Sequence, residues 1–125
     1  MCSSDLQIAP IVRKGVLADV AGLLGVDPLP VDFEITPDHL EACRIQPEPG
    51  GVVLIRTGWA RYWRDAKQFL TGGSGAVVRG PGPTLAAAQW LSSHGVFAAG
   101  SDTIAFERMP STMEVHVHQI GRAHV

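Results

Sequence analysis

Two short apolar runs and the stretch between them constrain the fold of this chain most strongly. Residues 52–55 are four consecutive apolar residues, which favours a strand that is buried on both faces. A second apolar run, 96–99, predicts another strand, and Gly95 before it is a typical helix end. The helix between them is predicted from one face that recurs every three or four residues: Ala87, Trp90, Leu91 and His94. Strand, helix and strand in this order predict parallel pairing and an α/β fold.

Shorter patterns place the other elements. Residues 16–20 are prone to form a strand, and residues 25–30 combine a glycine with two prolines, which is typical of a turn. Thr36 and Pro37 predict the start of a helix, as its N-cap and its first helical residue, and this helix should end near residues 43–45. Residues 71–83 are rich in glycine and proline, and we expect them to form a loop.

Composition excludes several classes of protein. The chain has 125 residues, enough for one domain with a core. Its net charge is −2 and it has no basic stripe, so nucleic acid is not a favoured partner. No apolar run approaches the ~20 residues that span a bilayer, and no signal-peptide pattern precedes the domain, so we expect no membrane association and a cytoplasmic location. Cys2 and Cys43 fit no metal-binding spacing.

Polar residues directly follow both predicted strands. Parallel α/β sheets bind ligands at the carboxyl ends of their strands, so these residues are candidates for a site: Arg56, Thr57, Trp59 and Asp102. Structural alternatives stay open for two of them. An aspartate in a turn more often caps the backbone than takes part in chemistry. Trp59 also lies at helical spacing from Tyr62 and Trp63, and such aromatic clusters usually belong to a core.

Three of the five histidines lie close to the C-terminus, and two of them form His116-x-His118. In a strand both side chains would point to one face, because side chains alternate with a period of two residues. The pair could therefore chelate a metal ion, or it could belong to a solvated edge strand.

Several motifs follow one another along the chain: RKGVLADV at 13–20, VVLIRTGW at 52–59, WLxxxG at 90–95, GxDT at 100–103, Phe106-Glu107 and VHVHQ at 115–119. In their order and spacing they resemble the cyclase family of metal-dependent hydrolases, which includes bacterial kynurenine formamidase and isatin hydrolase. The resemblance runs from about residue 8 to residue 119.

The resemblance implies a cyclase-like, swivelling α/β fold with a mixed, partly barrel-like sheet and flanking helices. It implies a divalent metal, zinc or manganese, that activates water and polarises an amide carbonyl. The expected substrates are small aryl amides, as in an arylformamidase of tryptophan catabolism that produces kynurenine, and the expected assembly is a homodimer. His118 matches a metal ligand of the family, with His116 as the runner-up. Arg56, Thr57, Trp59 and Asp102 are expected to line the substrate pocket or to support the ligands.

The sequence also departs from the family. The main metal motif, His-x-Gly-Thr-His-x-Asp-x-Pro-x-His, is absent, so we expect the catalytic residues to lie upstream and this chain to be inactive. Residues 1–6 and 120–125 resemble translated sequencing adapters, which leaves 7–119 as a partial, incomplete domain. The alternative is a small, non-catalytic binding or interaction module on the same scaffold. An in-frame His-x-x-x-His-x-Asp run in the upstream DNA would favour the enzyme.

Overall fold

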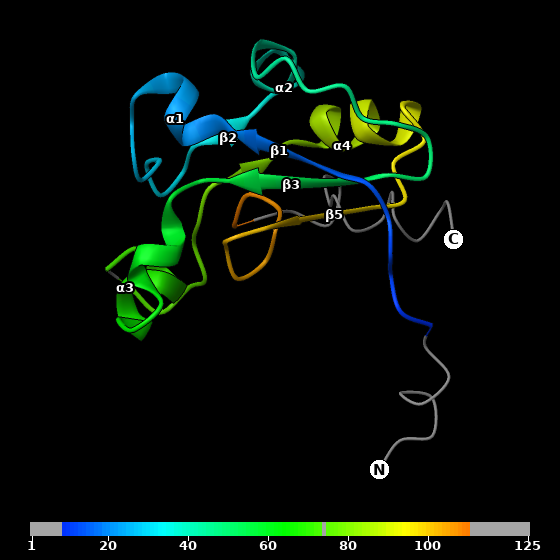
Figure 1. Ribbon diagram of the computed structural model, residues 1–125. Coiled ribbons are helices and arrows are strands. Elements are labelled where there is room, and N and C mark those ends of the chain that lie inside the picture. Colours follow the sequence, from blue (N-terminus) through cyan, green and yellow to red (C-terminus); the bar gives the residue numbers. More distant parts are fainter. Residues whose placement is uncertain (1–8, 74, 111–125) are drawn as a thin grey trace.

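A three-stranded parallel sheet forms the centre of the computed structural model, which describes residues 9–73 and 75–110 (Figure 1). Its strands are β1 (Gly15–Asp19), β3 (Val52–Arg56) and β5 (Ala98–Ser101), in the order β1-β3-β5. All neighbouring strands are parallel, with Leu17 opposite Leu54 and Leu54 opposite Gly100. The predicted parallel arrangement and the α/β fold class are confirmed, and the described residues form no closed barrel.

The last strand begins two residues later than the sequence predicts. The apolar run begins at Val96, but the amide of this residue still donates to the carbonyl of Leu91 at 3.3 Å. Val96 therefore completes the end of the preceding helix, and the chain joins the sheet only afterwards. Strand β5 ends at Ser101, and Asp102 follows it directly.

Two very short strands form a second parallel pair. Strand β2 (Glu34–Ile35) pairs with β4 (Gly82–Pro83), inside the stretch that we expected to be loop. The amide of Gly82 donates to the carbonyl of Phe33 at 3.2 Å. A side chain at Gly82 would collide with the backbone of residues 106–108. Glycine thus permits a close approach of two backbone segments here. A loop prediction based on composition cannot distinguish such a glycine from a glycine in a turn.

Helices lie between the strands of the described part of the chain: α1 (Val20–Leu24), α2 (Pro37–Ala42), the 3-10 helix η2 (Trp59–Tyr62), α3 (Ala66–Thr71) and α4 (Leu85–Ser93). The prediction for α2 is confirmed, since Thr36 is its N-cap and Cys43 its C-cap. Helices α1 and α3 were not predicted, because five or six residues are too few for a periodic pattern. Each of these two begins at an aspartate that accepts a backbone amide, and each ends at a glycine.

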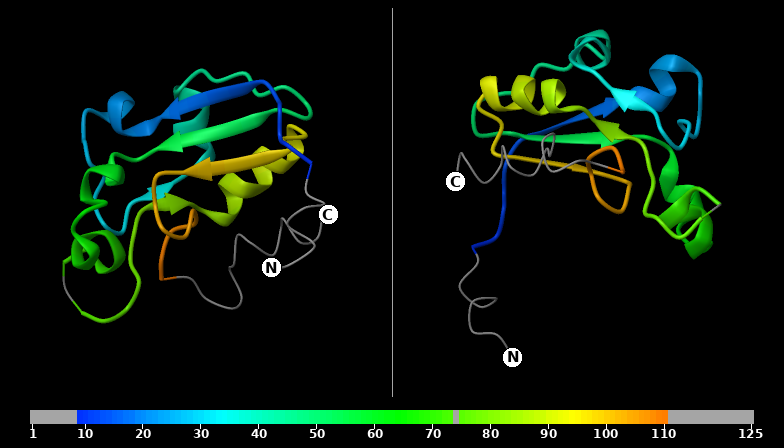
Figure 2. Two further views of the ribbon diagram at one scale, coloured as in Figure 1. Left: turned by 60° about the horizontal axis from the view of Figure 1, so that its bottom comes forward. Right: turned by 180° about the vertical axis from the view of Figure 1, so that it is seen from behind.

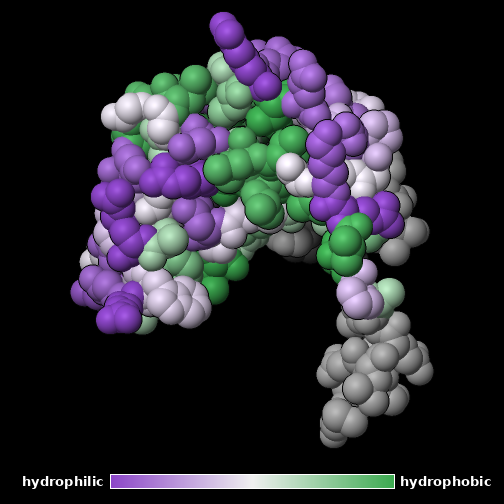
Figure 3. Space-filling model, viewed as in Figure 1, coloured by the Kyte–Doolittle hydropathy of each residue, from purple (hydrophilic) through white to green (hydrophobic). Residues whose placement is uncertain are grey.

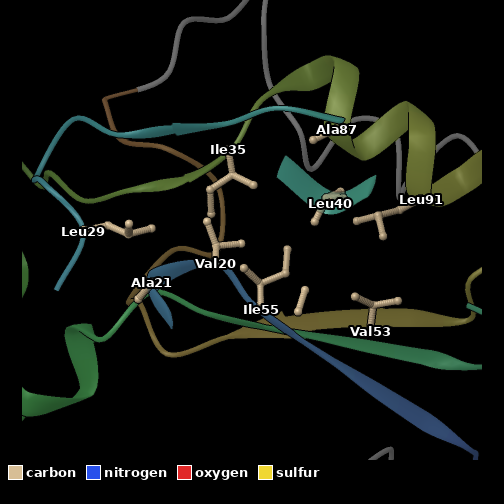
Figure 4. Close-up of a cluster of buried hydrophobic side chains, with 10 residues drawn as sticks. Val20, Ala21, Leu29, Ile35, Leu40, Val53, Ile55, Ala87 and Leu91 are labelled. Atoms are coloured by element: carbon tan, nitrogen blue, oxygen red, sulfur yellow. The ribbon is translucent and has the colours of Figure 1, made fainter. Parts of the chain in front are cut away.

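The helices α2 and α4 and the second sheet lie on the same side of the three strands (Figures 1 and 2). On this inner face Val53 and Ile55 are buried, and they pack in one cluster with Ile35, Leu40 and Leu91 (Figure 4). Helix α4 contributes Ala87, Ala88 and Leu91 to the buried side. Of the predicted helix face, Trp90 is only half-buried and His94 is exposed. These two rings pack on each other with their centroids 4.0 Å apart.

The opposite side, called here the outer face, carries Leu17 and Leu54. These side chains are 58% and 49% exposed, although Val53 and Ile55 beside Leu54 are buried. The prediction of a strand buried on both faces is therefore wrong for this part of the chain, since no described helix lies on the outer face. Figure 3 shows hydrophobic surface between two polar regions of the molecule.

Some predictions fall on residues that the structure does not describe. They are His116, His118 and the terminal segments 1–6 and 120–125. In the described ranges, no helix combines the length and the hydropathy needed to cross a membrane.

Candidate functional site

An open pocket lies where the carboxyl ends of the three parallel strands meet, on the side of the outer face. Its volume is about 360 Å³, at the small end of the range for pockets that bind small molecules. The lining combines apolar side chains with a few polar ones: Leu17, Leu54, Ile55, Arg56, Ala60, Ser101 and Asp102. The structure thus brings together Arg56 and Asp102, two of the four residues that the sequence placed at a site.

Asp102 holds the neighbouring strand end through three hydrogen bonds. One carboxylate oxygen, Oδ1, accepts from the backbone amide of Thr57 at 2.9 Å and from its hydroxyl at 2.7 Å. The other, Oδ2, accepts from the amide of Gly58 at 2.9 Å. Both carboxylate oxygens therefore bind the turn after β3, and Asp102 joins the ends of β3 and β5.

Thr57 and Trp59 do not line the pocket. Thr57 is completely buried, and Trp59 is 2% exposed. The indole nitrogen of Trp59 donates to the carbonyl of Leu29 at 2.9 Å, and its ring packs edge-on against Tyr62. Trp59 thus occupies the core position that was the structural alternative for the aromatic cluster, whereas Trp63 is 73% exposed. Of these two, Thr57 bonds a lining residue, Asp102.

Arg56 belongs to a network of alternating charges. Its guanidinium donates to Asp19 at 2.9 Å and to Asp27 at 2.6 Å, and Asp27 accepts a further bond from Arg61 at 2.9 Å. Two arginines and two aspartates leave this network with no net charge. The bonds to Asp27 and then to Asp19 raise the pKa of Arg56. The amide of Gly22, followed by Arg56, lowers the pKa of Asp19.

Gly58 allows the segments that carry this network to approach each other. Its φ of +86° lies in the left-handed region, and a Cβ there would collide with Asp27 and approach the Cα of Pro28 to 3.0 Å. The amide of Leu29 also donates to the carbonyl of Thr57 at 2.9 Å. The turn 25–30 is thereby fixed against the end of β3.

Sequence reasoning missed Asp19, Asp27 and Ala60 as parts of this region. Asp19 carried a signal, since it ends a strand-prone run at the same sheet edge as Arg56. Asp27 carried none, because its partners lie 29 and 34 residues further along the chain.

The described residues do not fit a zinc or manganese ion. Across residues 9–73 and 75–110, no three histidine, cysteine, aspartate or glutamate side chains lie close enough together to hold a metal. Asp19 and Asp27 form ion pairs with arginine, and Nδ1 of His39 accepts a hydrogen bond from the backbone amide of Thr36 at 3.0 Å. His118 and its runner-up His116 remain predictions for a metal ligand.

Fold and pocket define an α/β protein with an open pocket at the carboxyl ends of its parallel strands. A sequence model of the cyclase family, described as "Putative cyclase", matches residues 2–108. The chain belongs to the cyclase family. The resemblance inferred from the motifs is confirmed.

Solved structures support this assignment. The chain is similar to a structure described as a novel cyclase, with a TM-score of 0.64 and 28% identity over 77% of this chain and 32% of that one. It is similar to an isatin hydrolase bound to the product analogue thioisatinate, with a TM-score of 0.64 and 26% identity over 77% and 36% of the two chains. Isatin hydrolase A from Ralstonia solanacearum gives a TM-score of 0.67 and 26% identity over 87% and 43%. None of the curated proteins matches the chain. The chain therefore spans between about a third and two fifths of the length of these solved relatives.

Proposed function

We propose that this chain forms part of a metal-dependent hydrolase that cleaves the C–N bond of small aryl amides. The observation that carries the proposal is the pocket of about 360 Å³ at the carboxyl ends of the strands. Its apolar walls suit an aryl ring, and its polar rim suits an amide group. Membership of the cyclase family and similarity to an isatin hydrolase with a bound product analogue support the reaction class.

The substrate class includes linear and cyclic amides. N-formylkynurenine is the linear candidate, which would make the whole protein an arylformamidase of tryptophan catabolism, and isatin is the cyclic candidate. In either case the oxygen of water adds to the carbonyl carbon, the C–N bond breaks and the nitrogen takes up a proton. The proposal also includes a cytoplasmic homodimer that binds zinc or manganese, with His118 as the ligand from this chain and His116 as the alternative.

In this proposal the described residues shape the pocket and orient the substrate. Leu17 and Leu54 offer an apolar surface to the aryl ring, because both are exposed on the pocket wall. Arg56 is held in one orientation by two carboxylates, so it gives the rim a fixed polar group whose charge is neutralised. Asp102 fixes the turn at Thr57 and thereby the spacing of two strand ends. Fixed groups of this kind lower the entropic cost of orienting a substrate.

The test uses the whole protein, loaded with zinc or manganese and assayed with isatin and with N-formylkynurenine. Hydrolysis of either substrate is expected. Ala60→Phe places a bulky ring in the pocket and should raise the KM at least tenfold, because Ala60 lines it. Ala66→Phe is the matched control, at an exposed position in α3, and should leave the KM unchanged. If the enzyme is active and its KM is insensitive to Ala60→Phe, the substrate binds outside this pocket. Absence of hydrolysis with both metals and both substrates would refute the reaction class.

A further inference from the structure

Charged side chains surround the pocket and act on the charge of any ligand that enters it. Of the described residues that line the pocket, Arg56 is the cation and Asp102 is the acid. Each terminal nitrogen of the Arg56 guanidinium already donates to a carboxylate, Nη1 to Asp19 at 2.9 Å and Nη2 to Asp27 at 2.6 Å. Arginine recognises a ligand carboxylate through paired N–H groups of the same kind. An anionic ligand would therefore compete with two aspartates for one guanidinium.

Asp27 is fixed next to Arg56 by contacts on both sides. Its Oδ2 accepts from Arg56, and its Oδ1 accepts from Arg61 at 2.9 Å. The turn 25–30, which carries Asp27, is joined to the residue after β3 by a backbone hydrogen bond of 2.9 Å. The side chain of Asp27 is only 33% exposed, so water screens its charge incompletely. A negative charge therefore stays at a defined position behind the guanidinium.

The charges at the strand ends do not favour an anion. The network of two arginines and two aspartates described above carries no net charge. The carboxylate of Asp102 accepts its three hydrogen bonds from uncharged groups of Thr57 and Gly58, so no cation compensates it in these contacts. Asp102 and the network together carry one negative charge. A ligand carboxylate at this end of the sheet meets repulsion from Asp102 without a free cation to offset it.

We propose that Asp27 determines the specificity of this pocket, an inference that rests on the proposed function because it takes an aryl amide as the ligand. By neutralising Arg56, Asp27 makes the pocket select uncharged aryl amides over anionic aryl ligands of the same shape. The apolar walls accept the ring of either ligand, so the discrimination comes from charge. An uncharged amide does not have to displace an aspartate from Arg56. Placing an uncompensated like charge against the unwanted ligand is a general source of specificity.

Benzamide and benzoate test this role, since they share a ring and a size and differ in charge. Ligand-observed NMR measures the Kd of each ligand for the whole protein. Every variant is loaded with the same metal, so that binding of the carboxylate to the metal contributes equally. Asp27→Asn removes one negative charge next to Arg56 and keeps the size of the side chain. Asp32→Asn is the matched control, because it removes the same charge from an ion pair with Arg79 at 3.2 Å, and neither of these two residues lines the pocket.

Asp27→Asn should lower the Kd of benzoate at least about threefold, because one unit charge about 6 Å away contributes this factor even at the dielectric constant of water. The Kd of benzamide should not change, and Asp32→Asn should change neither value. The gain for benzoate should shrink at high salt, since salt screens the removed charge. Equal changes for the two ligands would overturn the proposal.

Arg61→Gln is a second variant with an effect of opposite sign, which keeps the test decisive if Asp27→Asn does not fold. It removes a cation that pairs with Asp27 and does not line the pocket. The Kd of benzoate should rise about twofold, the factor for a unit charge about 10 Å away in water, and the Kd of benzamide should not change. A benzoate affinity that responds to neither variant would overturn the proposal. If no amide is hydrolysed but both shifts occur, the reaction class fails and the role of Asp27 stands.

Discussion

Replacing Asp102 with asparagine tests whether this residue holds the strand ends together. In the native chain its carboxylate accepts three hydrogen bonds, two at Oδ1 from Thr57 and one at Oδ2 from Gly58. The asparagine carbonyl can keep both bonds from Thr57. Its NH₂ group, however, takes the place of Oδ2 and faces the amide of Gly58, so that two donors meet.

The expected loss follows from these contacts. A hydrogen bond to a charged group contributes about 1.5–3 kcal/mol, and a buried donor without an acceptor costs about 1–3 kcal/mol. Gly58 is buried, but Asp102 is only half-buried, so water can partly replace the lost acceptor. We therefore expect Asp102→Asn to lower the free energy of unfolding by about 2 kcal/mol. Asp102→Ala removes the acceptor for all three donors and should cost about 3–4 kcal/mol.

Urea unfolding and amide hydrogen exchange measure the effect. A local loss of about 2 kcal/mol should accelerate exchange at Gly58 by roughly 30-fold. Asp65→Asn is the matched control, because Asp65 accepts one exposed amide as the N-cap of α3 and asparagine caps equally well. This control should change stability by less than about 0.5 kcal/mol. If Asp102→Asn and Asp65→Asn have the same small effect, and exchange at Gly58 is unchanged, the proposed role of Asp102 is wrong.

Three further predictions concern other parts of the fold. Gly58→Ala should destabilise the chain by at least about 1 kcal/mol more than Gly25→Ala in urea unfolding, since both have positive φ but only Gly58 has neighbours within 4 Å; equal losses would contradict this. The lowered pKa of Asp19 gives stability that is present above the unfolded pKa of about 3.9 and is lost as the pH falls through the folded pKa. Asp19→Asn keeps the cap and should therefore flatten the pH dependence of the unfolding free energy between about pH 5 and pH 2. An unchanged pH profile would refute this prediction. Burial raises the pKa of Cys43, so in the Cys2→Ser variant this thiol should react with iodoacetamide at pH 8 more slowly in buffer than in urea, and equal rates would count against the packing.

The elements that could be predicted from the sequence are those with a strong local signal. The apolar run after Gly51 and the cap at Thr36 identified a strand and a helix, because each signal lies within a few residues of its element. Helices α1 and α3 are fixed instead by single caps, Asp19 and Asp65, which resemble ordinary turn residues in sequence. Burial on the outer face was wrongly predicted, because an apolar pattern indicates which side chains need a cover and not whether the cover is present.

The sequence could predict which strand ends form the candidate site, but not the contacts made there. Placing Arg56 and Asp102 at one sheet edge required only the parallel order of the strands. The partners of these side chains come from tertiary structure: Asp27 reaches Arg56 from a turn 29 residues away, and Asp102 bonds a turn 45 residues away. No spacing rule covers such distances, because the intervening helices and loops can have any length.

The contacts at the strand ends also explain why so many polar residues gather around a small apolar pocket. Both carboxylate oxygens of Asp102 accept hydrogen bonds from the backbone of one turn, and the two carboxylate oxygens of Asp27 pair with two arginines. Each polar group therefore fixes a neighbouring segment, and the segments in turn hold the pocket walls at Leu54 and Ala60. A wall that is fixed before a ligand arrives does not have to be ordered on binding, which favours affinity and orientation. The rim of this pocket is thus built for preorganisation. A substitution that breaks one of its polar contacts should widen the range of ligand orientations even where the substituted side chain touches no ligand.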